Sequence, residues 1–244
     1  MSEPVDTLEG WYVLHDFRRL NWPAWQGLGS EARATAEAAW RQWWQQEGPQ
    51  RSAEAGSSAA FAIVGHKADV MFLHFRRRLD DLYEVEHGLD RVGRQLWEQV
   101  WSYLSVVELS GYLARGGADH PEVQRRLFPA MPHHRYVCFY PMNKRRQGND
   151  NWYRLSREER AQLMRGHGEV GRRYAGQVLQ IITGSQGLDD WEWGVTLFAD
   201  DPLVFKKLVY EMRFDETSAR YADFGPFWVG MRLDDEWWQP WSLR

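Results

Sequence analysis

A tyrosine followed by a basic loop is the first place where residue types and spacing suggest chemistry. Tyr140 closes an apolar run, Met142 follows it, and three consecutive bases begin at Lys144. A phenol can give up an electron together with its proton, and cations bind carboxylates. For the bases alone, a solvated loop is the ordinary interpretation. The stretch therefore raises the question of which ligand would need both kinds of group.

A second candidate is His167, in the run MRGHGEVGRRY. Apolar residues three, four and seven positions away are expected to place it on the apolar face of a helix. They are Leu163, Met164, Val170, Gly171 and Tyr174. A lone inward histidine is more often a core residue than a ligand. However, Gly166, Gly168 and Gly171 each weaken a helix by about 1 kcal/mol relative to alanine. A broad, flat group at the helix backbone, such as a haem-type macrocycle with an axial imidazole, would explain these glycines.

Further polar side chains could complete such a site. Gln180 alternates with Val178 and Ile182, so the three share one face of a strand. A glutamine there is either a hydrogen-bonded core residue or a polar group directed into a cavity. Other cations and one hydroxyl could converge on a polyanionic ligand, because guanidinium groups pair well with carboxylates. They are Arg125, Arg126, Arg213 and Ser218.

The elements that must position these residues follow a β-α-β-β-α-β order in the second half of the chain. Apolar, β-branched and aromatic runs predict strands at 134–140, 177–184, 191–198 and 226–233. A capping box of Ser156 and Glu159 predicts a helix from about 156 to 175. Asp201 with Pro202 predicts another helix, to residue 212. This order is that of the ferredoxin-like unit.

The first half of the chain repeats the order less clearly. Strands are expected at 10–17, 59–65, 69–75 and 101–110, with helices from Ser30 to Gly48 and over 77–87. We expect an N-terminal unit (1–111), a linker rich in glycine, proline and charge (112–133), and a C-terminal unit (134–244). Each ferredoxin-like sheet leaves an apolar face open, so the fold class is α+β, with two such units packed as a dimeric α+β barrel.

Composition narrows the functional class. The net charge of -4 over 244 residues argues against wholesale nucleic-acid binding. The single Cys138 excludes an intrachain disulfide and fits a reducing compartment. The start MSEPVDTLEG lacks the pattern of a secretory signal, and no apolar run approaches the ~20 residues that span a bilayer. We therefore expect a cytoplasmic protein without nucleic-acid or membrane partners. Fifteen tryptophans suggest large flat surfaces or subunit interfaces.

The second half resembles a known family. It is similar to the coproheme decarboxylase (HemQ-type) branch of the chlorite dismutase superfamily through YPMNKRR, through SREERAQLMRGHGEVGRRYAGQVLQIITG and onward to GPFWVG. The first half resembles that family more loosely, through GWYVLHDFR. The resemblance implies a homopentamer in which each C-terminal unit binds one iron porphyrin. Coproporphyrin ferrochelatase would be a transient partner.

The resemblance also implies a reaction. Hydrogen peroxide drives the oxidative decarboxylation of iron coproporphyrin III (coproheme), which is both substrate and redox cofactor. Two propionates become vinyl groups, and haem b forms through harderohaem. By matching residues, His167 is the proximal iron ligand, Tyr140 the tyrosine that becomes a radical, and Lys144 a lysine that helps the second decarboxylation. Positions lining the distal side or the propionates match Arg126, Met142, Gln180, Arg213 and Ser218.

Two alternatives stay open. A chlorite dismutase-like haem enzyme carries an arginine on the distal side, and the neutral Gln180 cannot supply that charge. A haem-binding carrier or sensor without turnover is the other alternative. It has no use for an oxidisable phenol, so Tyr140 is the residue that distinguishes it from an enzyme.

Overall fold

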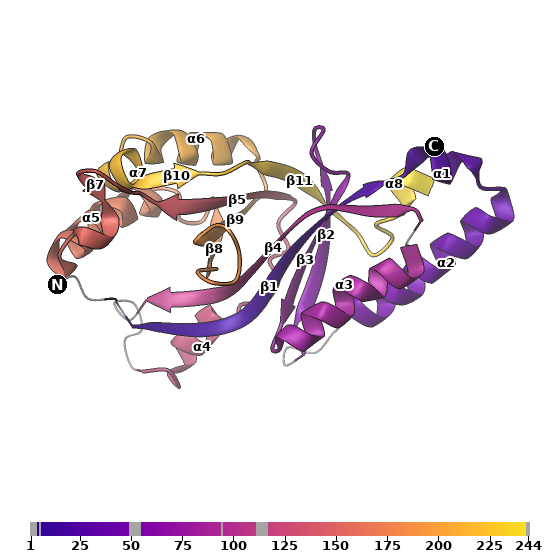
Figure 1. The fold of residues 1–244 in the computed structure, drawn as a ribbon, viewed down its shortest axis with the longest axis horizontal. Coiled ribbons are helices and arrows are strands. Elements are labelled where there is room, and N and C mark those ends of the chain that lie inside the picture. The colour runs from indigo at the N-terminus through magenta and orange to yellow at the C-terminus, as the bar shows by residue number, and fades with distance from the viewer. Residues whose placement is uncertain (1–3, 5, 49–54, 94, 111–116, 243–244) are drawn as a thin grey trace.

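The computed structural model describes residues 4, 6–48, 55–93, 95–110 and 117–242 (Figure 1). Its first half contains the expected order of strands and helices: β1 (Thr7–Leu20), α2 (Ser30–Glu47), β2 (Ser57–Ile63), β3 (Val70–Arg76), α3 (Leu79–Gly93) and β4 (Trp97–Ser110). These strands pair antiparallel in the order β2-β3-β1-β4. A short helix that the sequence patterns did not predict, α1 (Trp22–Gly27), begins directly after β1, where the Asn21 side chain caps it.

The second half repeats this topology. Its main elements are β5 (Tyr136–Lys144), α5 (Arg157–Arg172), β8 (Leu179–Gly184), β9 (Trp193–Ala199), α6 (Leu203–Met212) and β11 (Trp228–Leu233). The strands pair in the order β8-β9-β5-β11, which is the order of the first half when strands are numbered within each set. The predicted capping box also forms: Ser156 Oγ accepts from Glu159 N at 3.2 Å, and Glu159 Oε2 accepts from Ser156 N at 2.7 Å.

The two sets of strands join into one closed ring. β11 pairs with β2, and β4 pairs with β8. Each end of one four-stranded set is therefore hydrogen-bonded to an end of the other among the described strands, which closes the sheet. Aromatic side chains from both sets fill the interior, among them Phe17, Phe61, Tyr103, Phe139, Phe198 and Trp228. The expected α+β class with two ferredoxin-like units is thus confirmed.

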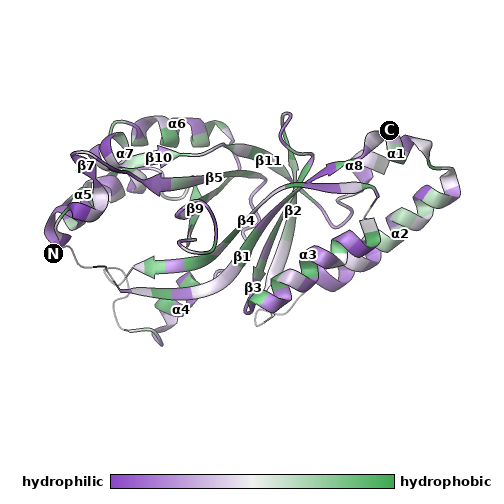
Figure 2. Cartoon of the chain, in the orientation of Figure 1, coloured by the Kyte–Doolittle hydropathy of each residue, from purple (hydrophilic) through white to green (hydrophobic). Residues whose placement is uncertain are grey.

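The helices cover the outside of the ring at opposite ends of the molecule (Figure 1). α2 and α3 lie over the first set of strands, and α5 and α6 lie near the second set. Hydrophobic residues follow the strands, whereas α5 is mostly hydrophilic (Figure 2). The remaining short elements are α4 (Pro121–Leu127), β6 (Arg146–Gln147), β7 (Asp150–Asn151), a 3-10 helix (Trp152–Arg154), α7 (Glu216–Tyr221), β10 (Ala222–Phe224) and α8 (Gln239–Ser242).

Part of the predicted linker forms a helix. Residues 112–116 lie outside the described residues, but α4 follows and packs against β1 and β4. The boundaries at 112 and 133 stay a prediction, and the C-terminal tail does not keep to its own half. Trp237 is fully buried in a cluster that α2, α3 and the first set of strands also form.

Many of the tryptophans belong to this same cluster, which we call the tryptophan core. Its buried tryptophans are Trp25, Trp40, Trp43, Trp44, Trp97, Trp237, Trp238 and Trp241. Their burial within one chain shows that they form an internal core. The expectation that the tryptophans form large flat surfaces or subunit interfaces is therefore wrong for these residues.

None of the helices among the described residues has the length and apolar character needed to cross a membrane.

Candidate functional site

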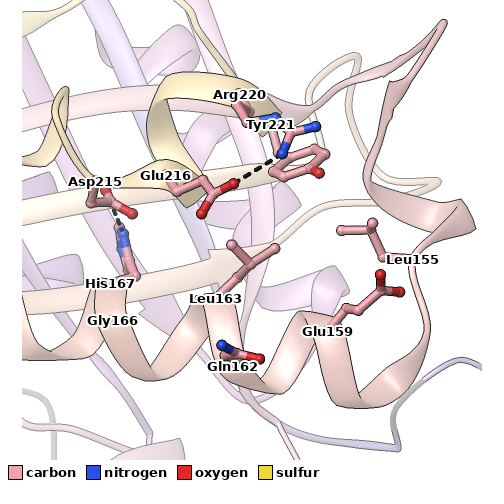
Figure 3. A pocket seen from close by; sticks show the side chains of 10 residues that line it. All are labelled: Leu155, Glu159, Gln162, Leu163, Gly166, His167, Asp215, Glu216, Arg220 and Tyr221. Atoms are coloured by element: carbon pink, nitrogen blue, oxygen red, sulfur yellow. Dashed lines mark hydrogen bonds and ion pairs between the residues drawn. The ribbon is translucent and has the colours of Figure 1, made fainter.

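His167 lies on α5 and is held by a carboxylate from α7. Its Nδ1 is 3.1 Å from Oδ2 of Asp215, the residue that caps the N-terminus of α7 (Figure 3). The other oxygen of Asp215 accepts from the backbone N of Thr217 at 3.0 Å and of Ser218 at 3.4 Å. Burial raises the pKa of Asp215, but the hydrogen bonds from His167 and Ser218 outweigh it and hold the pKa at about 2. A charged Asp215 fixes the imidazole with Nδ1 protonated, so Nε2 is the nitrogen that can bind a metal.

The helix around His167 does not bury the apolar face that its sequence predicts. Among the side chains of α5, only Arg160 is buried. Met164 is 44% exposed, and His167 itself is 29% exposed. A helix of a soluble domain normally packs its apolar side chains on a sheet. The inward placement expected for His167 is therefore only partial, and this side of α5 is accessible.

The strand that follows α5 presents a similar surface. Gln180 and Ile182 lie on the same face of β8, Gln180 is exposed, and Ile182 is 44% exposed. Ile181 between them is buried in the interior of the ring. The outer face of β8 therefore combines accessible apolar surface with one neutral amide, which suits a flat, mostly apolar ligand.

A pocket of about 440 Å³ lies between α5 and α7. Leu163, Gly166, His167, Asp215 and Arg220 are among the residues that line it (Figure 3). A Cβ atom added at Gly166 would meet nothing within 4 Å, so the helix backbone is open to the pocket at that residue. At Gly168 and Gly171, by contrast, an added Cβ would lie 3.5 Å from Arg172 Nη1 and from Met212 Cε, so the openness expected around His167 is seen at Gly166 alone of the three glycines.

Tyr140 lies on the outer face of β5 and is 8% exposed. Its ring stacks on Phe227 with the centroids 4.5 Å apart, and Phe224 lies at 5.8 Å. Burial raises the pKa of Tyr140, and the nearby charge of Arg213 opposes that shift. The guanidinium of Arg213 in turn lies 3.7 Å from the ring centroid of Phe224. A neutral phenol and a cation thus share one aromatic neighbour.

Lys144, at the end of β5, connects this region to His167. Its Nζ lies 4.3 Å from the ring centroid of Trp152. Burial lowers the pKa of Lys144 to about 8, while the carboxylates of Asp215 and Glu192 oppose the change. Asp215, which is hydrogen-bonded to His167, thus also acts through its charge on Lys144.

Two other predicted residues lie beside this group. Met142 pairs with Phe224 of β10 and Trp193 of β9 and packs against the cluster that contains Tyr140. Ser218 is buried, and its side chain is hydrogen-bonded to Asp215. Ser218 therefore supports the partner of His167, and its predicted contact with a ligand stays a prediction.

Arg126 lies apart from these residues. It is exposed on α4, next to Arg125, and α4 packs against β1 and β4. The predicted role of Arg126 thus stays a prediction. In the basic loop, Arg145 pairs with Asp223 at 2.8 Å, and Arg146 is 67% exposed, in line with the solvated loop expected for them.

Sequence reasoning missed Asp215 and Glu192. The run DETS at 215–218 is a recognisable N-cap pattern, but it gives no sign of a hydrogen bond to a histidine 48 residues away. Nothing in the run WEWG marks Glu192 as a neighbour of Lys144. Both contacts depend on tertiary structure alone.

A metal held only by protein side chains has no support in the described residues, where no group of three His, Cys, Asp or Glu could bind one. A single imidazole suffices when the other ligands belong to the bound group, as the four ring nitrogens of an iron porphyrin do. His167 with its open helix backbone fits such a group.

Comparisons with known proteins agree with this geometry. A family model described as chlorite dismutase matches residues 31–233. Two curated proteins named coproheme decarboxylase, from two strains of Thermus thermophilus, are each 53% identical over 97% of this chain and 95% of their own length.

Solved structures of similar proteins also match this chain over nearly its whole length. A structure described as a novel heme-binding protein from Thermus thermophilus has a TM-score of 0.93 and 50% identity, covering 100% of this chain and 99% of that one. A mutant chlorite dismutase from Candidatus Nitrospira defluvii has a TM-score of 0.77 at 20% identity, covering 96% of each chain. The second similarity shows the fold alone.

Proposed function

The chain belongs to the chlorite dismutase family, and from this we propose that it catalyses the peroxide-dependent oxidative decarboxylation of iron coproporphyrin III. Two propionates would become vinyl groups, giving haem b through harderohaem. The identity of 53% to curated coproheme decarboxylases supports this choice within the family. The structural observation that carries it is His167, whose Nδ1 is fixed by Asp215 and whose Nε2 is left for iron.

The residues present fit an iron porphyrin. His167 would hold the iron, and the accessible face of β8 with Gln180 and Ile182 would contact the ring. Lys144 and Arg213 would pair with propionates, because a ligand with four carboxylates needs fixed cations to set its orientation. The bound iron porphyrin, with peroxide, supplies the oxidising chemistry.

Tyr140 would carry the radical step. Its raised pKa keeps the phenol protonated at neutral pH, so it gives up an electron and a proton together. It would then recover a hydrogen atom from the propionate, which becomes a vinyl group by losing carbon dioxide and one further electron; the peroxide-oxidised porphyrin would take up that electron. Phe227 and Phe224 hold the ring in one orientation through this cycle.

Asp215 would tune the iron ligand. A carboxylate that accepts from the Nδ1–H of a ligating histidine fixes its orientation and raises its basicity. With a pKa of about 2, Asp215 keeps its charge throughout the physiological range. Ser218 and Thr217 would hold Asp215 in place.

The test is a titration of the protein, loaded with iron coproporphyrin III, with hydrogen peroxide. Mass spectrometry should show two successive losses of carbon dioxide with two hydrogen atoms. A parallel assay with chlorite should release no more oxygen than free iron porphyrin does. Oxygen release without mass loss would support the chlorite dismutase-like alternative, and a Soret band without either reaction would support a carrier.

We further propose that the protein acts in the cytoplasm as a homopentamer and meets coproporphyrin ferrochelatase transiently. Three large apolar side chains on and directly after α6 are exposed and are available for contacts with another subunit or with the ferrochelatase. Their exposed fractions are 63% for Leu203, 59% for Tyr210 and 73% for Phe214. Sedimentation analysis of the loaded protein measures the assembly, and a monomer at micromolar concentration would contradict it.

A further inference from the structure

Glu192 joins the start of β9 to the end of β5 through two reciprocal hydrogen bonds. The backbone N of Lys144 donates to Glu192 Oε2 at 2.8 Å, and the backbone N of Glu192 donates to Asn143 Oδ1 at 2.7 Å. The last pair of the β5–β9 ladder is Met142 with Trp193. The two side chains thus extend the pairing of these strands just beyond the ladder and fix the backbone from which Lys144 projects.

The Glu192 carboxylate is nearly buried. Its side chain is 12% exposed, and the hydroxyl of Tyr153 is hydrogen-bonded to it. The nearest guanidinium, Nη1 of Arg146, lies 3.9 Å from Oε1, and the Arg146 side chain is largely exposed. A carboxylate withdrawn from water is costly unless hydrogen bonds and nearby cations compensate it. Glu192 has the hydrogen bonds, and the compensating charge comes from Lys144 and Arg146.

Lys144 faces two carboxylates. The negative charges of Asp215, at the start of α7, and of Glu192, just before β9, both favour the charged amine, and the uncharged ring of Trp152 lies 4.3 Å from Nζ. Asp215 is already occupied by His167, Thr217 and Ser218. Of the two carboxylates, Glu192 is the one that also binds Lys144 directly, through the backbone N of that residue.

We propose that Glu192 is a positioning residue for Lys144, fixing its backbone and facing its ammonium group with a compensating negative charge. This inference rests on the proposed function in one respect: it gives Lys144 the task of meeting a propionate. Without Glu192, burial would favour the neutral amine, and a neutral amine cannot pair with a carboxylate. The pKa of Lys144 is about 8, close to neutral pH. The loss of one neighbouring negative charge can therefore change whether the amine is charged or neutral.

The charge of Lys144 can be measured without any ligand. The chain contains only four lysines, Lys67, Lys144, Lys206 and Lys207. Reductive methylation with ¹³C-formaldehyde gives each a distinct NMR signal that follows its protonation, and Lys144→Arg assigns the signal of interest. In Glu192→Gln the signal of Lys144 should titrate about one pH unit lower than in the parent protein.

Two matched variants separate the causes. Asn143→Ala removes one hydrogen bond of the reciprocal pair but keeps the carboxylate, so the titration of Lys144 should stay where it is. Glu84→Gln removes a 65% exposed charge on α3 and controls for net charge. An unchanged titration in Glu192→Gln, or an equal change in Asn143→Ala, would overturn the proposal.

The loaded enzyme gives an independent readout. In Glu192→Gln, the rate of the second decarboxylation should begin to fall at a lower pH than in the parent protein, while the first is affected less. If the NMR titration moves as expected but no decarboxylation occurs in any variant, the proposed function fails and the assignment of Glu192 stands. If decarboxylation occurs and its pH profile is the same in both proteins, Lys144 does not act through its charge, and the positioning role is refuted.

Discussion

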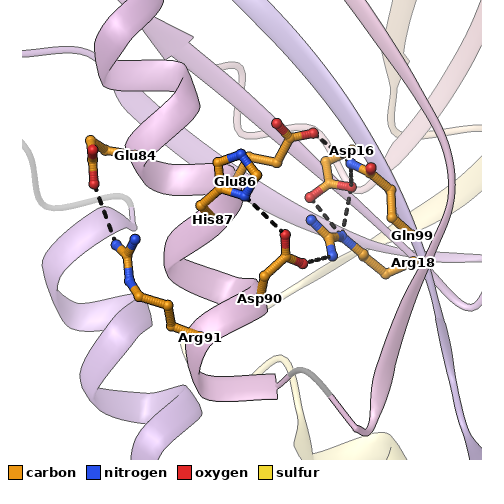
Figure 4. Close-up of polar contacts among 8 residues, drawn as sticks. All are labelled: Asp16, Arg18, Glu84, Glu86, His87, Asp90, Arg91 and Gln99. Carbon is orange, nitrogen blue, oxygen red and sulfur yellow. Dashed lines mark hydrogen bonds and ion pairs between the residues drawn. The ribbon is translucent and has the colours of Figure 1, made fainter.

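β1 and β5 occupy equivalent places in the two halves. Their outer faces differ in whether the polar side chains form buried ion pairs. On β1, Asp16 and Arg18 form an ion pair at 2.7 Å with both side chains 1% exposed. Asp90 of α3 also pairs with Arg18, and Gln99 donates to Asp16 at 3.0 Å (Figure 4). On β5, the outward residues nearest its end are Tyr140, Met142 and Lys144, and none of these three forms a buried ion pair of this kind.

The helices that follow these strands differ in the same way. α2 buries three tryptophans, Trp40, Trp43 and Trp44, in the tryptophan core. α5 buries only Arg160. The first half therefore covers its outer face with its own tryptophans, whereas the second half places a phenol, two cations and an imidazole beside a helix that buries little apolar surface. A repeated topology thus does not repeat the same side chains: the two halves share a strand order but differ in which polar groups stand on the outer face of the sheet.

The largest expected effect comes from Tyr140→Phe. This change keeps the ring and its stacking but removes the oxidisable hydroxyl, so decarboxylation should fall by more than about 100-fold, a loss within the range for a positioned proton-transfer group. The Soret band after loading should be unchanged. Tyr83→Phe, at a 59% exposed tyrosine on α3, is the control and should retain full turnover. Equal turnover in both variants would refute the radical role.

Arg18→Met should show the opposite pattern. It leaves Asp16 buried without its partner, which typically costs about 3 to 5 kcal/mol. Urea unfolding should register the loss, whereas porphyrin binding by the remaining folded protein should keep the parent affinity. A variant that folds normally but loses porphyrin binding would show that the two halves do not divide stability and ligand binding in this way.

Trp237→Ala tests the tryptophan core itself. Its indole is fully buried and lies 5.4 Å from the ring of Trp97 and 4.8 Å from that of Phe72. Removing it should lower the free energy of unfolding by about 3 to 5 kcal/mol. Met164→Ala on α5 is the matched control, and because that side chain is 44% exposed we expect a change within about 0.5 kcal/mol. Similar losses in the two variants would contradict the contrast between α2 and α5.

The smallest expected effect is that of Asp215→Asn on the free energy of unfolding and on its dependence on acidic pH. The pKa of Asp215 is depressed to about 2 in the folded protein, below the value of 3.8 for an unperturbed aspartate. Its contribution to stability is therefore complete above about pH 4 and is lost as the pH falls towards 2. Asp215→Asn should remove about 1 to 2 kcal/mol at neutral pH and flatten this part of the acid unfolding curve. An unchanged acid limb would show that the contact with His167 does not stabilise the fold.

Local patterns predicted most of the fold. The capping box at Ser156 and the alternation of apolar runs depend on neighbours in sequence, so the order of strands and helices could be read directly. The boundaries were less accurate: β4 begins at Trp97, four residues before the expected start at 101. Short helices such as α7 were not predicted, because a helix of six residues has too few turns to show a helical period in its apolar residues.

The site was predicted in its residue types but not in its connections. Resemblance to a family singled out His167, Tyr140 and Lys144, whose roles stay predictions, and the structure adds the carboxylates that are hydrogen-bonded to His167 and to the backbone of Lys144. Asp215 and Glu192 each lie 48 residues from the residue they hold, counted from His167 and Lys144. Periodicity carries no information about such pairs, because chain folding alone brings them together.

The position of Trp237 also affects the order in which the chain can fold. The first half of the protein leaves the ribosome early. However, the tryptophan core lacks the indole of Trp237 until the chain has been synthesised to that residue. Domains made first usually fold first. Here the N-terminal half would wait in an incomplete form, with Trp40, Trp43 and Trp97 uncovered, and the tail would complete it last. Ribosome-bound chains ending before residue 237 should therefore be more sensitive to protease within 22–97 than chains that include the tail.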